Sequence, residues 1–282
     1  LLPGISLTGE KEGEKETETE TEMESDNTSP DGIGGWFTAL KPLAAGSASQ
    51  LIRTLLLQAV LVRATAEAAG AGAAGAHQIC IQVWWVTLFA LDALAVAAQS
   101  LVAASLGAGD VISARNAADR SLKWALAAGT AVGVGIYAAG PLLPALFTDD
   151  VELVEQASGP LQLVALLQPL NAAVFVGDGV LQGAADFDYL AVAMAASATP
   201  ALVLLGQVGE GVEAAIGAGA SAEVVSVTAL NGVWQSMSAL QLGRAMTLSW
   251  RYFWDKTGPV TLPEGTTEDA IEDTNAAKQN GE

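Results

Sequence analysis

The sequence predicts an all-α integral membrane protein, built as a six-transmembrane-helix bundle between disordered acidic termini. The chain of 282 residues is 51% hydrophobic and 15% charged, whereas a water-soluble domain carries about one charged residue in four. The net charge of −19 comes mostly from the two ends, and long apolar stretches fill the middle. This composition disfavours a soluble enzyme, a nucleic-acid-binding protein and a wholly disordered chain.

The two ends of the chain carry most of the charge. Residues 1–31 hold ten acidic residues and two lysines, and residues 255–282 hold seven acidic residues and two lysines. Residues 10–25 read EKEGEKETETETEMES and have no apolar period, so they cannot bury enough surface to offset the entropy of ordering. We therefore expect a disordered acidic cytoplasmic linker over residues 1–35 and a disordered tail over residues 255–282.

Six apolar stretches between these ends are long enough to cross a membrane. About 20 helical residues span roughly 30 Å of hydrocarbon. A backbone in hydrocarbon must satisfy its own hydrogen bonds, which favours helices. We predict a helical unit over residues 36–254. Its six helices are residues 36–62, 77–106, 122–148, 154–185, 188–209 and 224–249.

The basic residues predict the orientation of these helices, because cytoplasmic loops are enriched in Lys and Arg. If the helices alternate in direction, one side of the membrane receives Lys41, Arg115, Arg120, Lys123, Arg244, Arg251 and Lys256. The other side receives only Arg63. Both termini are therefore expected in the cytoplasm, stroma or matrix, and the sequence leaves open the plasma membrane or a plastid or other organelle membrane.

Three ionisable residues lie inside the predicted spans: Arg53, Asp92 and Asp178. A charge at mid-bilayer depth is costly, so such residues usually face the bundle interior, a partner or a water-filled cavity. This makes the three residues candidates for ion coupling and solute contact. The alternative is a structural ion pair between Arg53 and one aspartate, without any role in transport.

Further polar residues lie in the same predicted helices as the two aspartates. Four amides are candidates for hydrogen bonds to a polar solute or to the aspartates: Gln82, Gln99, Gln168 and Asn171. Pro169 removes a backbone donor in the fourth predicted helix. We expect it to kink that helix.

The chain offers little to metal or covalent chemistry. Cys80 is its only cysteine and His77 its only histidine. A disulfide within the chain and a cysteine zinc site are therefore excluded, and we expect no catalytic residue, metal or cofactor. The GxxxG pairs at residues 129–133 and 179–183 let helix backbones approach closely, so we interpret them as packing positions.

Several blocks of residues resemble the second half of a multidrug and toxic compound extrusion (MATE) transporter. They are HQICIQVW at 77–84, DALAVAAQ at 92–99, LFTDD at 146–150, and QPLNA at 168–172 leading to FVGDG at 175–179. Over residues 36–258 the chain is most similar to the plant and algal branch that includes citrate exporters. The resemblance implies a twelve-helix antiporter of two six-helix lobes, of which this chain is the C-terminal lobe.

The resemblance implies secondary active efflux of organic solutes by H⁺ or Na⁺ antiport with alternating access. The solute would be an organic anion such as citrate, or a xenobiotic. The expected partners are the lipid bilayer, the solute, the coupling ion, and a missing N-terminal lobe or a second copy of the chain; no nucleic acid is expected. The alternative function is a non-transporting half-protein that acts as a scaffold or binds a partner.

Overall fold

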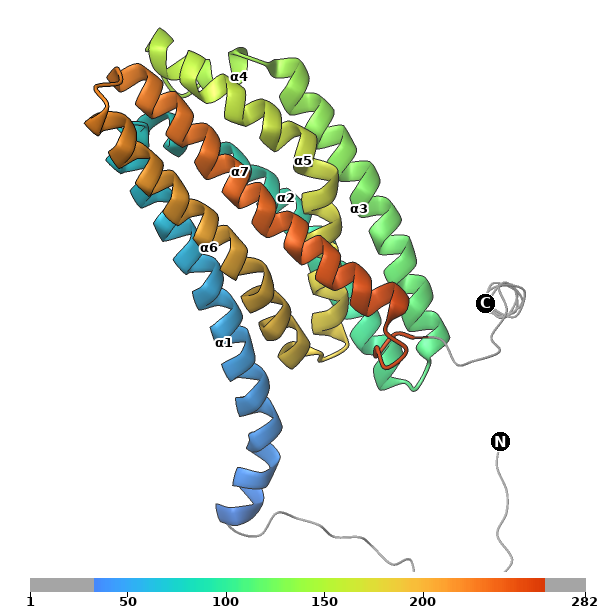
Figure 1. The fold of residues 1–282 in the computed structure, drawn as a ribbon. Coiled ribbons are helices and arrows are strands. Elements are labelled where there is room, and N and C mark those ends of the chain that lie inside the picture. The colour runs from blue at the N-terminus through green and yellow to red at the C-terminus, as the bar shows by residue number, and fades with distance from the viewer. Residues whose placement is uncertain (1–32, 262–282) are drawn as a thin grey trace, which may run out of the picture. The chain divides into compact units, whose positions relative to one another are not determined.

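A computed structural model describes residues 33–261, which are helical over most of their length and include no strand (Figure 1). The predictions of disorder for residues 1–32 and 262–282 lie outside the described residues. The chain divides into two compact units, residues 1–41 and 42–282. Of the first unit, residues 33–41 are described, and they are helical. The second unit holds the remaining helices and the candidate site.

Seven α-helices and a π-helical turn make up the described chain. They are α1 (Ile33–Gly70), α2 (Ala74–Gly107), α3 (Val111–Ala139), α4 (Leu142–Ala145), α5 (Val151–Gly183), α6 (Phe187–Gly217), α7 (Ala222–Ser249) and η1 (Trp250–Trp254). Five of these are long and apolar enough to cross a membrane, namely α2, α3, α5, α6 and the part of α1 from Ala44 to Gly70. The more polar α7 runs beside them (Figure 1).

The helix ends follow from local chemistry. The Asp110 side chain accepts a hydrogen bond from the Ser113 amide at 2.9 Å and starts α3. Asp150 accepts one from the Glu152 amide at 2.9 Å and starts α5. Both are N-cap contacts that satisfy donors left free at a helix start. Gly109, with φ of +74°, lies in the short connection after α2, in a conformation that glycine adopts without strain.

The third predicted helix, residues 122–148, is wrong at both ends, since α3 runs from Val111 to Ala139. Arg115, Arg120 and Lys123 therefore lie in the first turns of a helix and not in a loop. A helix of 29 residues is about 44 Å long, which exceeds the roughly 30 Å of hydrocarbon, so its charged end extends beyond the membrane. α1 and α6 likewise end later than the predicted helices 36–62 and 188–209, at Gly70 and Gly217.

α5 lies at the centre of the bundle and packs against α2, α3 and α7. Glycines on α5 and α3 allow two of these contacts. A Cβ at Gly179 or Gly183 would collide with the backbone carbonyl of Ala95 or Gln99 on α2, and a Cβ at Gly133 with that of Ala165 on α5. The two GxxxG pairs thus lie where helix backbones touch, as small residues do in membrane proteins.

The ribbon of α5 changes direction along its length (Figure 1). The helix contains Pro160 and Pro169, and a proline inside a helix removes one backbone hydrogen bond and bends the helix. The assignment of the bend to Pro169 stays a prediction.

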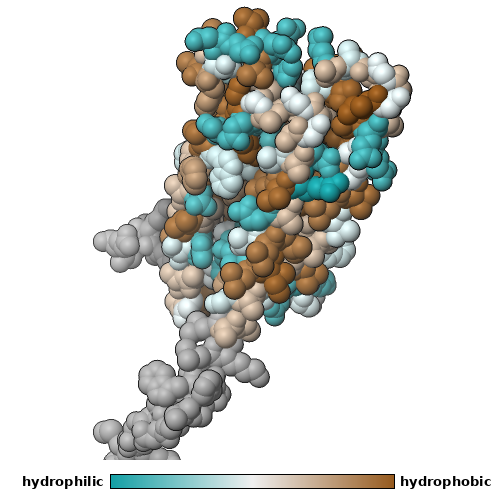
Figure 2. Space-filling model, turned by 90° about the vertical axis from the view of Figure 1, so that its left-hand side faces the viewer, coloured by the Kyte–Doolittle hydropathy of each residue, from teal (hydrophilic) through white to brown (hydrophobic). Residues whose placement is uncertain are grey.

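Hydrophobic side chains cover much of the outer surface of the bundle. On α1, Leu51, Leu55 and Val62 are each more than 60% exposed. Figure 2, which faces the left-hand side of Figure 1, shows hydrophobic side chains over much of this face with hydrophilic ones between them. Such exposed apolar area is normal for a protein whose surroundings are lipid.

Candidate functional site

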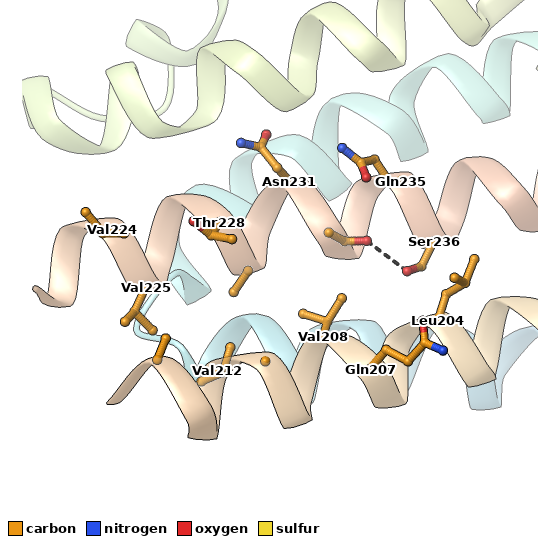
Figure 3. A pocket seen from close by; sticks show the side chains of 14 residues that line it. Leu204, Gln207, Val208, Val212, Val224, Val225, Thr228, Asn231, Gln235 and Ser236 are labelled. Atoms are coloured by element: carbon orange, nitrogen blue, oxygen red, sulfur yellow. Dashed lines mark hydrogen bonds between the residues drawn. The ribbon is translucent and has the colours of Figure 1, made fainter. Parts of the chain in front are cut away.

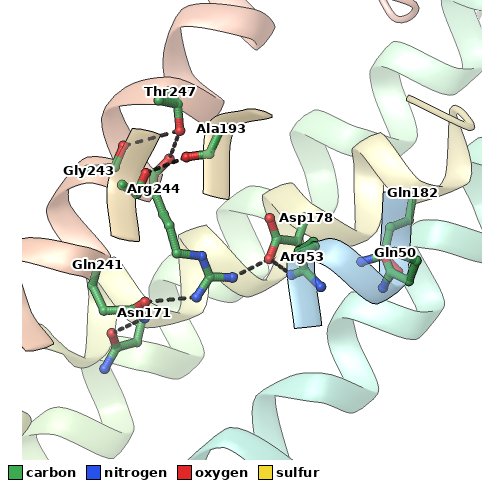
Figure 4. A network of polar contacts seen from close by, with 11 residues as sticks. Gln50, Arg53, Asn171, Asp178, Gln182, Ala193, Gln241, Gly243, Arg244 and Thr247 are labelled. Atoms are coloured by element: carbon green, nitrogen blue, oxygen red, sulfur yellow. Dashed lines mark hydrogen bonds and ion pairs between the residues drawn. The ribbon is translucent and has the colours of Figure 1, made fainter. Parts of the chain in front are cut away.

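A buried carboxylate from the centre of the bundle binds two arginines from two other helices (Figure 4). Asp178 on α5 accepts hydrogen bonds through the same oxygen, Oδ2, from Arg53 on α1 and from Arg244 on α7. The side chains of Asp178, Arg244 and Arg53 are 5%, 3% and 13% exposed. Three charges are therefore held together away from lipid and water, and we call these three residues the charge centre.

A chain of amides extends the charge centre along α7 and α5. The second terminal nitrogen of Arg244 donates to the Gln241 amide oxygen at 2.8 Å. The Gln241 nitrogen donates in turn to the Asn171 amide oxygen at 2.8 Å. The Arg244 guanidinium also lies 5.3 Å from the centre of the Phe175 ring, within the range of a cation–π contact. Arg244 is thus fixed from several sides.

The charge centre is not balanced, since it holds two positive charges and one negative charge. The Nε atoms of Arg53 and Arg244 are buried and have no hydrogen-bond partner within residues 33–261. Buried donors of this kind are rare in folded proteins and often mark a site for a ligand, ion or water. The arrangement can accept an anion, and it can release Asp178 to a competing cation.

The structure brings some predicted site residues together and separates others. Arg53, Asp178 and Asn171 lie in the network around the charge centre. Gln168 is also buried, but its nitrogen donates to Thr87 Oγ1 at 3.1 Å on α2. Gln99 is partly buried on α2, where its carbonyl touches α5.

Asp92 and Gln82 lie apart from the charge centre, on an exposed face of α2. No ion pair of Asp92 occurs in the part of the chain that the structure describes. The ion pair of Arg53 is therefore with Asp178. Asp92 is a separate carboxylate in mid-helix, and the residues about one turn before and after it on α2 include the exposed, apolar Phe89 and Val96.

Arg244 and Gln241 are functional candidates that sequence reasoning missed. Arg244 was counted with the basic residues on the cytoplasmic side of the membrane, and this is wrong, because it lies inside α7 (Ala222–Ser249) and is buried within the bundle. The sequence signal that could have found Arg244 is its position inside the predicted helix 224–249, five residues before its end. Within residues 33–261, no group of three His, Cys, Asp or Glu is placed to hold a metal.

A second polar network closes the end of the bundle at η1. Arg251 donates to Asp186 at the start of α6 (2.7 Å) and to Asp255 (2.5 Å). Hydrogen bonds from Thr257 and from Arg251 lower the pKa of Asp255 to about 2. The hydrogen bond to Asp186 raises the pKa of Arg251, because bonds to a charged form favour that form. These residues join α6 to the segment after α7.

The comparison with known families agrees with this helical arrangement. The family model described as MatE matches residues 42–208, which is more than half of the chain. The chain belongs to the MatE family. Two relatives from Arabidopsis thaliana are similar to part of it: Protein DETOXIFICATION 44, chloroplastic, is 36% identical over 118 residues, and Protein DETOXIFICATION 42 is 35% identical over 130 residues. These stretches cover 42% and 46% of this chain and 23% and 25% of the relatives.

Solved MATE structures share the fold of this MatE-family chain. The crystal structure of MATE in the straight conformation has a TM-score of 0.66 at 18% identity. The outward-facing conformation of a multidrug resistance MATE family transporter of the MOP superfamily has a TM-score of 0.64 at 20% identity. In both cases the match covers 83% of this chain and 50% of the solved chain. The chain therefore corresponds to one lobe of the MATE fold and spans about half the length of these proteins.

Proposed function

We propose that the chain is the C-terminal lobe of a secondary active transporter that exports organic solutes by H⁺ or Na⁺ antiport with alternating access. The observation that carries this proposal is the charge centre, in which Arg53, Asp178 and Arg244 join three helices inside a membrane bundle. Ionisable groups at this depth are costly and typically serve solute or ion pathways. Membership of the MatE family supports the same reading.

The charge of the centre favours an organic anion as solute. Two guanidiniums face one carboxylate, so one positive charge is left over in a site of low polarity. A guanidinium binds a carboxylate through paired hydrogen bonds, and the two Nε donors of the centre have no partner within residues 33–261. A solute such as citrate therefore fits better than a cationic xenobiotic.

Asp178 also supplies a physical basis for coupling. Its oxygen links α1 and α7 to α5 through the hydrogen bonds from Arg53 and Arg244. A proton or Na⁺ that takes this oxygen competes with both arginines and favours an arrangement in which these helices separate. If the solute binds the paired arrangement, cation and solute exclude each other, which is what antiport requires.

Asp92 is the second carboxylate that we propose for ion coupling. It lies on an exposed face of α2, where an ionised carboxylate is disfavoured by lipid and a protonated one much less so. Access of water to Asp92 from either side of the membrane would therefore change the cost of its charge. Gln82 lies on the exposed surface of the same helix, so a solute path along α2 would meet both side chains.

The proposal is tested by flux measurements on the reconstituted chain. Proteoliposomes loaded with radiolabelled citrate should release it when an H⁺ or Na⁺ gradient is imposed. Arg53→Gln and Asp178→Asn should each abolish the gradient-dependent release, and Asp92→Asn should make release independent of the gradient. Arg63→Gln is the matched control, because Arg63 lies on the same helix with a side chain that is 51% exposed.

The alternative is a membrane half-protein that binds a partner without transport. The observation that favours it is the span of the chain, which covers half of the solved MATE chains it matches. A missing N-terminal lobe or a second copy would then be the partner. Gradient-dependent citrate release by the chain alone would exclude this reading. Absence of release from correctly folded protein would favour this alternative, and equal release from Arg53→Gln and Arg63→Gln would contradict the transport site.

A further inference from the structure

A groove between α6 and α7 lies apart from the charge centre (Figure 3). It has a volume of about 580 Å³, which is within the range of pockets that bind small molecules. The second half of α6 and the first half of α7 form its walls. Ser236, the last residue of its α7 wall, comes eight residues before Arg244, so Arg244 lies about 12 Å farther along the helix.

No charged residue lines the groove. Its polar side chains include Gln207 on α6 and Thr228, Asn231 and Gln235 on α7, and Figure 3 shows Asn231 and Gln235 on one side of α7, one turn apart. None of these four side chains forms a hydrogen bond with any residue from 33 to 261. Ser236, by contrast, already donates to the Gly232 carbonyl at 2.8 Å.

These unpaired amides lie in the middle parts of two long helices. α6 has 31 residues and is about 46 Å long, so each of its ends extends about 8 Å beyond a hydrocarbon layer of roughly 30 Å. Gln207 lies ten residues before the end of α6, and Asn231 nine residues after the start of α7. Both therefore lie about 15 Å from the helix ends, with exposed side chains whose amide groups are open to a ligand.

We propose that this groove binds an uncharged amphipathic molecule that carries amide, sulfonamide or hydroxyl groups. Each amide of Asn231 and Gln235 offers two donors and an acceptor, which a hydrogen-bonding head group satisfies and a lipid tail does not. The apolar walls, formed by residues such as Leu204, Val208 and Val212, suit a ring or chain. A charged solute would find no counter-charge here, in contrast to the charge centre.

A substitution at Gly211 can block the groove. It lines the groove on α6, and a Cβ built on it would meet nothing within 4 Å. A large side chain at this position therefore fills the groove without displacing the backbone. Gly135 on α3 is the matched control, because it also has open space around its Cβ and does not line the groove.

The test uses three fluorescent probes that share one ring system and differ in charge. Dansylamide is neutral, dansyl sulfonate is an anion and dansylcadaverine is a cation. Each is titrated, with direct excitation of the dansyl group, against the full chain in nanodiscs and against empty nanodiscs. We expect saturable, protein-dependent binding of dansylamide with a blue-shifted emission, and affinities at least about tenfold weaker for both charged probes, as expected when a charge enters a site without a partner.

Variants locate the binding. Gly211→Trp should weaken dansylamide binding by about tenfold or more, since it occupies the groove. Asn231→Leu and Gln235→Leu should each weaken it by about fivefold, the effect of one lost hydrogen bond. Gly135→Trp should leave it unchanged, and Asp178→Asn should do so in samples whose Cys80 thiol stays protected. The buried thiol of Cys80 reports folding, because it becomes accessible to a maleimide only when the bundle opens.

Three results would overturn the proposal: no saturable dansylamide binding to folded chain, equal binding of all three probes, or unchanged binding in both Gly211→Trp and Gln235→Leu. If Gly211→Trp fails to fold, the leucine variants decide the matter alone. Loss of binding in Asp178→Asn would place the probe at the charge centre and would also overturn it. None of these outcomes bears on citrate release, so the two proposals fail separately.

Discussion

Removal of the single carboxylate of the charge centre is the most informative perturbation of this fold. Asp178→Asn preserves the size of the side chain but leaves Arg53 and Arg244 side by side without a counter-charge. The Arg244 side chain is 3% exposed, so water cannot replace the lost partner. Breaking a buried ion pair in this way costs about 3–5 kcal/mol. We expect the free energy of unfolding to fall by about 4 kcal/mol.

Removal of one arginine should cost less than removal of the carboxylate. Arg244→Gln leaves Asp178 paired with Arg53, and the remaining pair is electrically neutral. The loss is then that of hydrogen bonds to a charged group, about 2 kcal/mol. The order of damage, with the aspartate worse than either arginine, follows from the count of charges and does not depend on the absolute values.

The double variant Asp178→Asn/Arg244→Gln tests the same reasoning by non-additivity. It leaves one arginine, Arg53, whose side chain is 13% exposed and is therefore better able to reach water. Residues in contact show coupling energies of about 0.5–3 kcal/mol. The double variant should consequently lose less than the sum of the two single losses, and about as much as Asp178→Asn alone.

The measurement is equilibrium unfolding by SDS in mixed micelles, followed by far-UV circular dichroism and by the accessibility of the Cys80 thiol. Arg63→Gln serves as the control, since within residues 33–261 Arg63 pairs with Glu67 on the same helix and its own side chain is 51% exposed, and ion pairs that reach solvent contribute less than buried ones. Arg244→Gln as damaging as Asp178→Asn, or a strictly additive double variant, would refute the electrostatic account of the charge centre.

Two further predictions concern packing and the end of the bundle. Gly183→Val should lower the free energy of unfolding by about 1–3 kcal/mol, because the new Cβ collides with the Gln99 carbonyl. Gly135→Val should have little effect, because the space around its Cβ is open. Equilibrium unfolding by SDS measures both variants. The carboxyl of Asp255 should titrate near pH 2 by carbon-13 NMR, and Thr257→Val should move the midpoint towards the ordinary value of 3.8.

The lowered pKa of Asp255 makes the stability of this end of the bundle depend on pH. Because the pKa of Asp255 is lowered in the folded protein, its bonds to Thr257 and Arg251 stabilise the end of the bundle fully above about pH 4 and are lost as the pH falls towards about 2. An Asp255 midpoint that is the same in wild type and Thr257→Val would contradict the assignment. Equal unfolding of Gly183→Val and Gly135→Val would contradict the close approach of α2 and α5.

The sequence predicted the helical membrane fold because hydrophobic stretches of membrane-spanning length are a strong signal. It failed at the helix ends. Arg115 fell between the second and third predicted helices and lies in α3, and Arg244 was counted with the basic residues on the cytoplasmic side and lies buried inside α7. The reason is the same in each case. A charged residue was taken to mark the end of a span, although a helix can run past the hydrocarbon layer or bury its charge against a partner.

The site was predictable only in part for a related reason. Arg53 and Asp178 stood out as charges within apolar stretches, and their pairing was among the readings that the sequence allowed. The choice of Asp178 over Asp92, however, depends on how α1 and α5 pack, and no sequence period encodes that. The sequence alone could not identify Gln241, because the role of an amide inside a helix depends on the residues to which it is hydrogen-bonded in the folded protein.

Asp92 lies in an exposed stripe of α2 that is a candidate contact surface for another part of a transporter. With Trp85 and Phe89 it forms a stripe at helical spacing along α2, and Trp85 and Phe89 are 37% and 69% exposed. An ionised carboxylate in mid-span does not face lipid tails without a large cost, so this stripe must border water or another protein surface. The solved MATE chains continue for as much length again as the part matched here. We propose that a second lobe or a second copy, where one packs beside this lobe, leaves a polar path along this stripe on α2.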